Sequence, residues 1–246
     1  MTTEAQTAAG PEELRVNDDA YATEHYDDAY FETGLRIEQT RLHALRCGWL
    51  EKYLKPGPGD RIVDLGCGVG IVDKFLASKG ATVHGVDLHP KAVAGARRLN
   101  EGNDKATFQV GDASNVPNLE DGSFDKAVSC DVTEHCGYDV MLGIFREAYR
   151  LLRPGGLYFT YTPNPKHWVE KLKEYGVMKS DPTHTGLRTT PVIREALEKV
   201  GFEIEANPMT SCMMPGLAHA ESAWRFLRIA PQLANYRVIL LAKKPV

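Results

Sequence analysis

The sequence predicts an α/β protein built on a doubly wound, mostly parallel sheet of seven strands. Between residues 61 and 162, short apolar runs of strand length alternate with helical patterns, which is typical of a parallel sheet covered on both faces. A glycine-rich turn follows the first of these runs and leads directly into a helical pattern, as at the ligand-binding corner of such sheets. The chain has 246 residues, 43% of them hydrophobic, which is sufficient for one domain of this class.

The expected elements follow from the spacing of apolar residues and from the residues that interrupt it. A helix over residues 35–54 is ended by the Pro-Gly repeat at residues 55–59. Beyond it we expect strands at 61–65, 82–86, 106–110, 124–129, 157–162, 201–206 and 236–243. Helices are expected at 71–78, 91–99, 140–152 and 192–200, with a further short helix within 166–190.

We expect residues 20–246 to form a single domain after a disordered tail, residues 1–19, which has almost no large apolar side chain. The core is predicted over residues 59–164 and 191–246. Long insertions in an open α/β sheet usually lie over the ligand crevice, so three segments are expected to act as lid or cap. They are residues 20–55, 166–190 and 208–234.

Composition argues against several classes of function. The net charge is −4 and no dense basic run occurs, so the electrostatic signature of a nucleic-acid-binding protein is absent. Five scattered cysteines without a Cys-x-x-Cys pair predict reduced thiols and a cytoplasmic location. The late apolar run Val238–Ala242 is too short to span a bilayer, and no signal peptide is visible. We therefore expect a small-molecule substrate and no membrane partner, while the oligomeric state is left open.

The glycine turn narrows the choice of ligand. Gly66, Gly68 and Gly70 stand at alternate positions after the first strand, where the lack of Cβ lets a ligand approach the backbone. In the dinucleotide-binding fingerprint the third glycine would stand at position 71, where this chain has an isoleucine. This mismatch is moderate evidence against NAD or FAD as the ligand. Asp87 ends the second strand about 20 residues further on, where a carboxylate can accept hydrogen bonds from ribose hydroxyls. The alternative for Asp87 is a helix cap or a turn residue.

Five segments together resemble the motifs of class I S-adenosylmethionine (SAM) methyltransferases, in the family's order and at its spacing. They are the glycine segment Val63–Gly70, the acidic Gly85–Asp87, the turn Gly111–Ala113, the stretch Phe124–His135 and the turn Leu152–Gly156. The resemblance covers about residues 61–164 and the C-terminal strand. It is closest to the small-molecule enzymes that include the ubiquinone-biosynthesis O-methyltransferases.

The resemblance implies that the chain binds SAM and identifies the residues that contact it. They are Asp64, Gly66, Cys67, Gly68, Gly70, Asp87, Leu88, Asp112, Ala113, Cys130 and Asp131. Asp64 would hold the ammonium group, Asp87 the ribose, and Asp112 the adenine amino group. The alternative for Asp64 is a buried acid that caps the glycine loop, and the alternative for Asp112 is a plain turn residue. Tyr26 is a candidate lid residue over the cofactor or the substrate.

Methylation of an oxygen requires a base, and two histidines are the leading candidates. His184 lies in the stretch Asp181–His184, within the loop expected over the crevice. His135, beside Glu134, follows the fourth strand and should face the same pocket. Each could instead be a histidine that only packs or binds backbone. A metal site formed by Glu134, His135 and Cys136 is not expected, because adjacent residues rarely converge on one ion.

The sequence therefore predicts a SAM-dependent methyltransferase that acts on a small molecule, most readily at oxygen. Methylation of nitrogen or carbon is an open alternative. An NAD(P)-dependent oxidoreductase shares the glycine turn and Asp87, but the sequence shows no obvious Tyr-x-x-x-Lys pair. A protein that binds SAM without catalysis is the third alternative.

Overall fold

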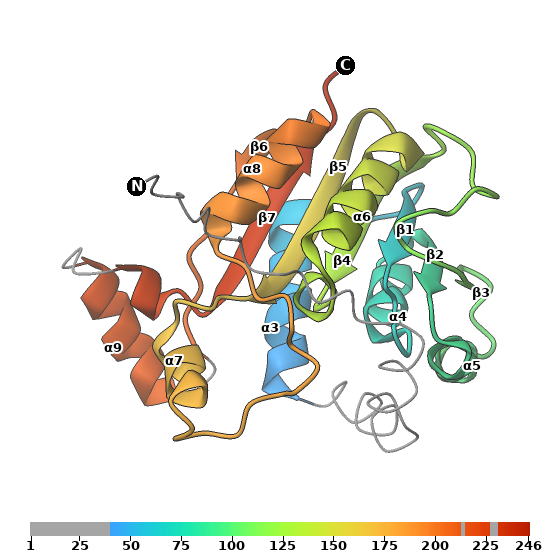
Figure 1. The fold of residues 1–246 in the computed structure, drawn as a ribbon. Coiled ribbons are helices and arrows are strands. Elements are labelled where there is room, and N and C mark those ends of the chain that lie inside the picture. The colour runs from blue at the N-terminus through green and yellow to red at the C-terminus, as the bar shows by residue number, and fades with distance from the viewer. Residues whose placement is uncertain (1–39, 213–214, 227–230) are drawn as a thin grey trace, which may run out of the picture.

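The computed structural model describes residues 40–212, 215–226 and 231–246. The predicted tail over residues 1–19 and the candidate lid residue Tyr26 lie outside this part of the chain. The described residues form a seven-stranded sheet in the order β3-β2-β1-β4-β5-β7-β6 (Figure 1). The fold class predicted from the sequence is thus confirmed.

The strands alternate with helices along the first half of the chain, which makes the sheet mostly parallel. The strand bounds are β1 Arg61–Leu65, β2 Thr82–Asp87, β3 Ala106–Val110, β4 Phe124–Cys130, β5 Leu152–Pro163, β6 Glu203–Ala206 and β7 Arg237–Lys243. Strands β1 to β5 pair in parallel, whereas β7 runs antiparallel to both β5 and β6. The carboxyl ends of β1, β2 and β4 and the first residue of β7 consequently share one edge of the sheet.

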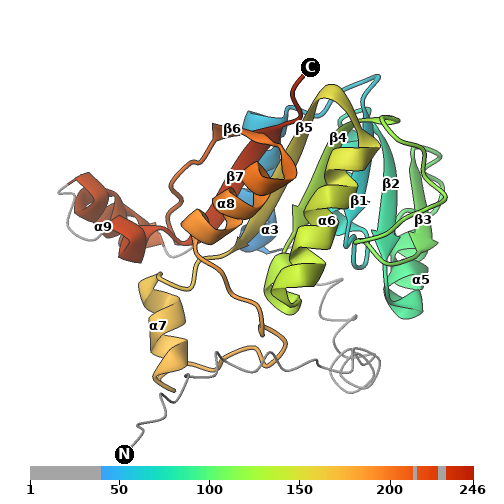
Figure 2. The ribbon, with the colours of Figure 1, turned by 45° about the horizontal axis from the view of Figure 1, so that its top comes forward.

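Helices cover both faces of the sheet (Figures 1 and 2). Their bounds are α3 Arg41–Trp49, α4 Ile71–Ser78, α5 Pro90–Leu99, α6 Tyr138–Leu151, α7 Trp168–Glu174, α8 Thr190–Val200 and α9 Pro215–Phe226. Three short elements join them, the π-helical turn η1 Leu50–Leu54 and the 3₁₀ turns η2 Thr133–His135 and η3 Pro231–Ala234. One core cluster buries the apolar faces of α6 and α8, and a second buries those of η1 and α4.

Most element bounds agree with the sequence prediction to within two residues, but the turn before β5 differs. Residues 153–156 were expected to separate the preceding helix from the strand. Instead β5 begins at Leu152, which lies opposite Phe124 of β4. The Gly155 N–H donates to the carbonyl of Lys244 and the Lys244 N–H donates to the carbonyl of Gly156, both at 2.9 Å. Backbone pairing with the chain end therefore extends the strand through the Pro-Gly sequence.

A buried carboxylate joins helix α7, which follows β5, to helix α9, which follows β6. Glu221 of α9 is 3% exposed, and its Oε1 accepts a hydrogen bond from Trp168 Nε1 at 2.6 Å and lies 2.9 Å from His167 Nε2. Its Oε2 accepts from the Cys212 N–H at 2.6 Å. These bonds hold α7 against α9, within segments predicted to act as lid and cap. Their action as a lid stays a prediction.

No helix within the described ranges combines the length and the apolar character needed to cross a bilayer.

Candidate functional site

The glycine turn after β1 has the backbone conformation that its sequence predicts. Gly66, Gly68 and Gly70 all have positive φ angles, of 91°, 54° and 75°. A Cβ atom on Gly66 would lie 2.5 Å from Val132, so glycine is required there for packing. A Cβ on Gly68 would meet no atom within 4 Å, so this residue faces open space. The turn therefore offers exposed backbone at the start of α4, next to the buried side chain of Cys67.

Asp87 connects the glycine turn to the following loop. Its Oδ2 accepts a hydrogen bond from the Gly68 N–H at 2.8 Å, and its Oδ1 accepts from the His89 N–H at 2.9 Å. Burial raises the pKa of this carboxyl above its usual value, while the two N–H donors oppose that shift. Each oxygen keeps a second lone pair for a ligand. Leu88, the next residue, is a 54% exposed apolar side chain that a planar ligand could cover.

Two buried carboxyl groups lie beneath the glycine turn. Asp64 near the end of β1 is 1% exposed, and Asp73 in the first turn of α4 is fully buried. Neither oxygen of Asp73, nor Oδ1 of Asp64, has a hydrogen-bond partner among the described residues. Burial raises the pKa of Asp64 to about 7, and burial together with the Asp64 charge raises that of Asp73 well above its ordinary value. The pair is therefore suited to a cationic ligand.

The turn after β3 is ordered by its own side chain. Oδ1 of Asp112 accepts hydrogen bonds from the Ser114 N–H at 2.8 Å and the Ser114 hydroxyl at 2.7 Å. Asp112 is exposed, and Ala113 packs at the margin of the core beneath α6. The local role of a turn residue is thus fulfilled, and the second carboxylate oxygen remains for a ligand. Adenine binding by this turn stays a prediction.

The residue after β4 holds two buried arginines. Cys130 ends the strand as an 8% exposed side chain, and Asp131 follows with a positive φ of 55°. Asp131 Oδ1 pairs with Arg237 at 2.9 Å, and its Oδ2 pairs with Arg46 of α3. Although burial alone would raise it, the two guanidinium groups lower the pKa of Asp131. Both guanidinium groups also lie over the ring of Tyr161, 5.6 and 5.1 Å from its centroid.

The two predicted catalytic histidines lie together beside Glu134. The ring centroids of His135 and His184 are 5.0 Å apart, in an edge-to-face arrangement. His135 Nδ1 lies 3.2 Å from the Thr183 carbonyl, so it donates and the lone pair is on Nε2. Burial and the neighbouring His184 lower the pKa of His135 to about 4, and burial lowers that of His184. Both imidazoles are therefore neutral at physiological pH.

Two other residues that carry an acid–base group, His167 and Tyr161, are buried in structural contacts. His167 is fully buried, where it caps the start of α7 and interacts with Glu221. Tyr161 is 2% exposed between the guanidinium groups, and burial raises its pKa far above the physiological range. Neither is suited to accept a proton from a ligand at neutral pH.

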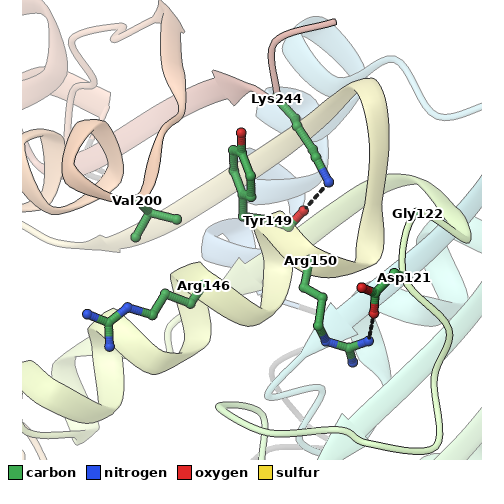
Figure 3. A pocket seen from close by; sticks show the side chains of 7 residues that line it. All are labelled: Asp121, Gly122, Arg146, Tyr149, Arg150, Val200 and Lys244. Atoms are coloured by element: carbon green, nitrogen blue, oxygen red, sulfur yellow. Dashed lines mark hydrogen bonds and ion pairs between the residues drawn. The ribbon is translucent and has the colours of Figure 1, made fainter.

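A cavity of about 510 Å³ lies elsewhere on the molecule (Figure 3). It is bordered by residues at the end of α6, and by Gly122 just before β4 and Lys244 just after β7. Both of these lie at the amino-terminal edge of the parallel strands. Around it Arg150 pairs with Asp121, and Lys244 Nζ donates to the Tyr149 carbonyl at 2.7 Å. The glycine turn, Asp87 and the histidines belong to the opposite edge.

Three charged residues of the site were not identified from the sequence. Asp73 lies on the buried face of α4 with Leu76 and Ala77, and an acid at this helical spacing was an available signal. Arg46 and Arg237 were not distinguishable from surface arginines. They meet only because α3 and β7 pack on either side of Asp131.

Comparisons with known proteins point to one family. Residues 63–160 match the family described as a methyltransferase domain. The chain is 32% identical over 180 residues to 24-methylenesterol C-methyltransferase 2 of Oryza sativa subsp. japonica, which covers 68% of this chain and 47% of that protein. It is 30% identical over 132 residues to the ubiquinone biosynthesis O-methyltransferase of Pseudomonas entomophila, covering 52% and 55%. The chain thus spans about half the length of the curated relatives it matches.

Solved structures share the fold. Phosphoethanolamine N-methyltransferase 2 of Haemonchus contortus, in complex with S-adenosyl-L-methionine, has a TM-score of 0.69 at 22% identity, covering 93% of this chain and 60% of that one. A SAM-dependent methyltransferase from Archaeoglobus fulgidus has a TM-score of 0.66 at 20% identity, covering 88% and 100%. At this level of identity the similarity shows a common fold.

Proposed function

From the premise that the chain belongs to the class I SAM-dependent methyltransferases, we propose that it transfers the methyl group of SAM to an oxygen atom of a small molecule. When bound, SAM supplies a methyl group activated by a positively charged sulfur. The protein contributes alignment, exclusion of water and removal of the acceptor's proton. The curated relatives include both O- and C-methyltransferases, so the choice of oxygen rests on the site itself.

The residues around the glycine turn fit this cofactor. The unpartnered Oδ1 of Asp64 is suited to its ammonium group, since a buried carboxylate requires a donor or a cation. The free lone pairs of Asp87 suit the ribose hydroxyls, and the exposed Leu88 suits the face of adenine. The open space at Gly68 admits the chain that joins these groups. NAD is supported less, since the third fingerprint position is Ile71, which begins α4.

One observation carries the choice of oxygen, namely neutral imidazoles next to a cationic edge. The neutral imidazole of His184 can accept a proton, as an attacking hydroxyl requires, whereas the pKa of His135, lowered to about 4, makes it the weaker base. Arg46 and Arg237 share the single carboxylate of Asp131, which leaves an excess of positive charge nearby. Such charge stabilises an oxygen that is losing its proton and disfavours the carbocation formed when an alkene carbon is methylated.

The first experiment measures the cofactor alone. Isothermal titration calorimetry should detect SAM and S-adenosylhomocysteine at micromolar dissociation constants. Binding of NAD with no binding of either adenosyl compound would refute the proposal. Binding of SAM without turnover on any acceptor would instead favour the non-catalytic alternative.

The second experiment identifies the reacting atom. Transfer from methyl-labelled SAM is measured on small phenols, catechols and hydroxy acids, and on alkene lipids of the sterol type. Label in an ether or ester supports the proposal, whereas label on carbon supports the C-methyltransferase alternative suggested by the sterol relatives.

The predicted base is tested by His184→Ala. We expect kcat to fall by roughly 10²–10⁴-fold, with SAM affinity nearly unchanged. His219→Ala is the matched control, because His219 is exposed on α9. Activity of the His184 variant within a few-fold of the unchanged protein would leave His135 as the base.

A further inference from the structure

The structure brings together three metal-ligating side chains that are not contiguous in sequence. One ligand atom each from Glu134, His135 and His184 lies within 4.8 Å of the other two. Glu134 and His135 belong to η2, directly after β4, whereas His184 comes from the loop after α7. From the sequence alone a metal site is not expected here, because Glu134, His135 and Cys136 are adjacent residues. In the structure the third ligand is instead His184, which comes from the loop between α7 and α8.

Glu134 provides an observation that itself points to a cation. The residue is 1% exposed, and its Oε2 accepts a hydrogen bond from the Thr162 hydroxyl at 2.8 Å. Its Oε1 is buried without a hydrogen-bond partner in the described parts of the chain. An unsatisfied buried carboxylate oxygen is costly, and a coordinated cation would satisfy it.

The surroundings of His135 and His184 suit the coordination of a metal ion. Because His135 Nδ1–H donates to the Thr183 carbonyl, its Nε2 carries the lone pair. A backbone carbonyl on the second ring nitrogen is the usual way in which proteins orient a metal-ligating imidazole. Asp181 Oδ2 lies 3.8 Å from Nε2 of His184, which places a carboxylate behind the second imidazole.

Backbone contacts fix the loop against η2. The Gly186 N–H donates to the Glu134 carbonyl at 2.7 Å. Arg188 donates to the carbonyls of Thr133 at 2.8 Å and Cys136 at 2.9 Å. The residues that carry the ligands are therefore held together by contacts on both sides. Asp131 is excluded from the set, because both of its oxygens pair with arginines.

We propose that Glu134, His135 and His184 bind one divalent transition-metal ion of the zinc class. Two imidazoles and one carboxylate are a common ligand set for zinc, whereas magnesium prefers oxygen ligands alone. Tetrahedral bonds of about 2.0–2.2 Å place ligand atoms roughly 3.3–3.6 Å apart. The side chains, whose ligand atoms lie within 4.8 Å of one another, therefore close by up to about 1.5 Å when the ion binds. A three-ligand site leaves a coordination position open.

The role of the ion in catalysis rests on the proposed function, but the ion replaces the imidazoles as the group that activates the hydroxyl, because a coordinated nitrogen has no lone pair left to accept a proton. The open position would take the acceptor hydroxyl, whose proton is released to water because coordination lowers its pKa. The resulting oxygen anion attacks the methyl carbon of SAM. An O–C bond forms, the C–S bond breaks with its electron pair going to sulfur, and S-adenosylhomocysteine leaves as a neutral thioether. The ion undergoes no redox change.

The test measures metal binding without SAM or acceptor, so its outcome is independent of methyl transfer. The full-length protein is stripped with a chelator and titrated with Zn²⁺ by competition calorimetry, with Mg²⁺ as the comparison ion. We expect one tightly bound Zn²⁺ per chain and Mg²⁺ binding at least a hundredfold weaker. Equal binding of the two ions, or no Zn²⁺ binding, would overturn the proposal.

Variants locate the site. Glu134→Gln and His184→Ala should each weaken Zn²⁺ binding at least a hundredfold, while His219→Ala should not change it. Circular dichroism checks that each variant is folded. The His184 variant is less prone to misfold than the Glu134 variant, because His184 lies in a loop and Glu134 is buried. Substitution with Co²⁺ gives a second readout, since nitrogen and oxygen ligands produce no thiolate charge-transfer band. Such a band, or unchanged affinity in the His184 variant, would assign the ion to cysteines or to other residues and refute the site.

Discussion

At the scale of single residues, Asp87 has a structural role in the turn and a proposed role in binding the cofactor. Its two oxygens already accept hydrogen bonds from the N–H groups of Gly68 and His89. These bonds hold the glycine turn to the end of β2 and aim the carboxylate at the space beside Gly68. Positioning of this kind lowers the entropy that cofactor binding must overcome.

Asp87→Ala should therefore weaken SAM binding at least tenfold while the fold survives. The change removes the acceptor for two ribose hydroxyls, and hydrogen bonds to a charged group contribute about 1.5–3 kcal/mol each. Calorimetry gives the dissociation constant, with Asp104→Ala as the control because Asp104 is an exposed acid beyond α5. An unchanged dissociation constant would limit Asp87 to its role in the turn.

The site residues that the sequence predicts are those that belong to local motifs. The glycine turn and Asp87 are readable because spacing along one strand–turn–helix unit determines their positions. Asp73 was not identified, although its spacing from Leu76 and Ala77 places it on the apolar face of α4. Arg46 and Arg237 are separated by 191 positions (237 − 46) in the numbering. Only the fold brings them to Asp131, which Arg46 reaches from α3 and Arg237 from β7.

At the scale of elements, the loop between α7 and α8 is as important to the site as the strands. Gly186 lies so close to η2 that a Cβ atom there would be 2.2 Å from the Cys136 carbonyl oxygen. The half-buried Arg188 binds Gly186 and two carbonyls of the η2 region with one guanidinium group. The loop therefore places His184 against His135 by close backbone contact.

Arg188→Ala should lower the methyl-transfer rate at least tenfold and leave SAM affinity within about twofold. Two or three hydrogen bonds from a charged group are lost, each worth about 1.5–3 kcal/mol, so the loop and its histidine lose their position. The proposed SAM site lies at the other end of the sheet edge, so we expect SAM binding to be unaffected. Arg194→Ala is the control, since Arg194 forms only an exposed pair with Glu198 on α8. Equal rates for the two variants would contradict this account.

Regular elements were predicted well because their apolar spacing is a local property. Strand β3 and helix α4 have the predicted bounds, and α8 begins two residues earlier than expected. The segments around α7 and α9 were predicted only as insertions. Their positions depend on contacts such as that of Glu221 with Trp168, 53 residues away, which no periodicity encodes.

At the scale of the whole molecule, charge is divided along the carboxyl edge of the sheet. Buried acids gather at the β1–β2 side, where Asp64, Asp73 and Asp87 surround the glycine turn. Buried guanidinium groups gather on the β4–β7 side, where Arg46 and Arg237 flank Asp131. This division is consistent with the proposed function, in which the acidic side holds the ammonium end of SAM and the cationic side faces an acceptor that attacks as an anion.

This division makes the effect of SAM on stability depend on pH. The pKa of Asp64 is raised to about 7 by burial, above its value in the unfolded chain. Between these two values the folded protein binds more protons than the unfolded one. The contribution of Asp64 to the free energy of unfolding therefore falls as pH rises towards 7, and the contribution of its neighbour Asp73, whose pKa is raised further, falls with it. An ammonium group at Asp64 offsets this loss by stabilising the ionised form.

SAM should accordingly raise the melting temperature more at pH 7.5 than at pH 5.5. Thermal unfolding is followed at both pH values, with saturating SAM and without it. Asp64→Asn is the control that isolates this group, because the substituted side chain does not titrate. The variant should lose most of the pH dependence of the SAM-induced shift and bind SAM more weakly at pH 7.5. A shift of equal size at both pH values in the unchanged protein would mean that Asp64 does not hold the ammonium group, because an ion pair with a protonated carboxyl is lost at the lower pH.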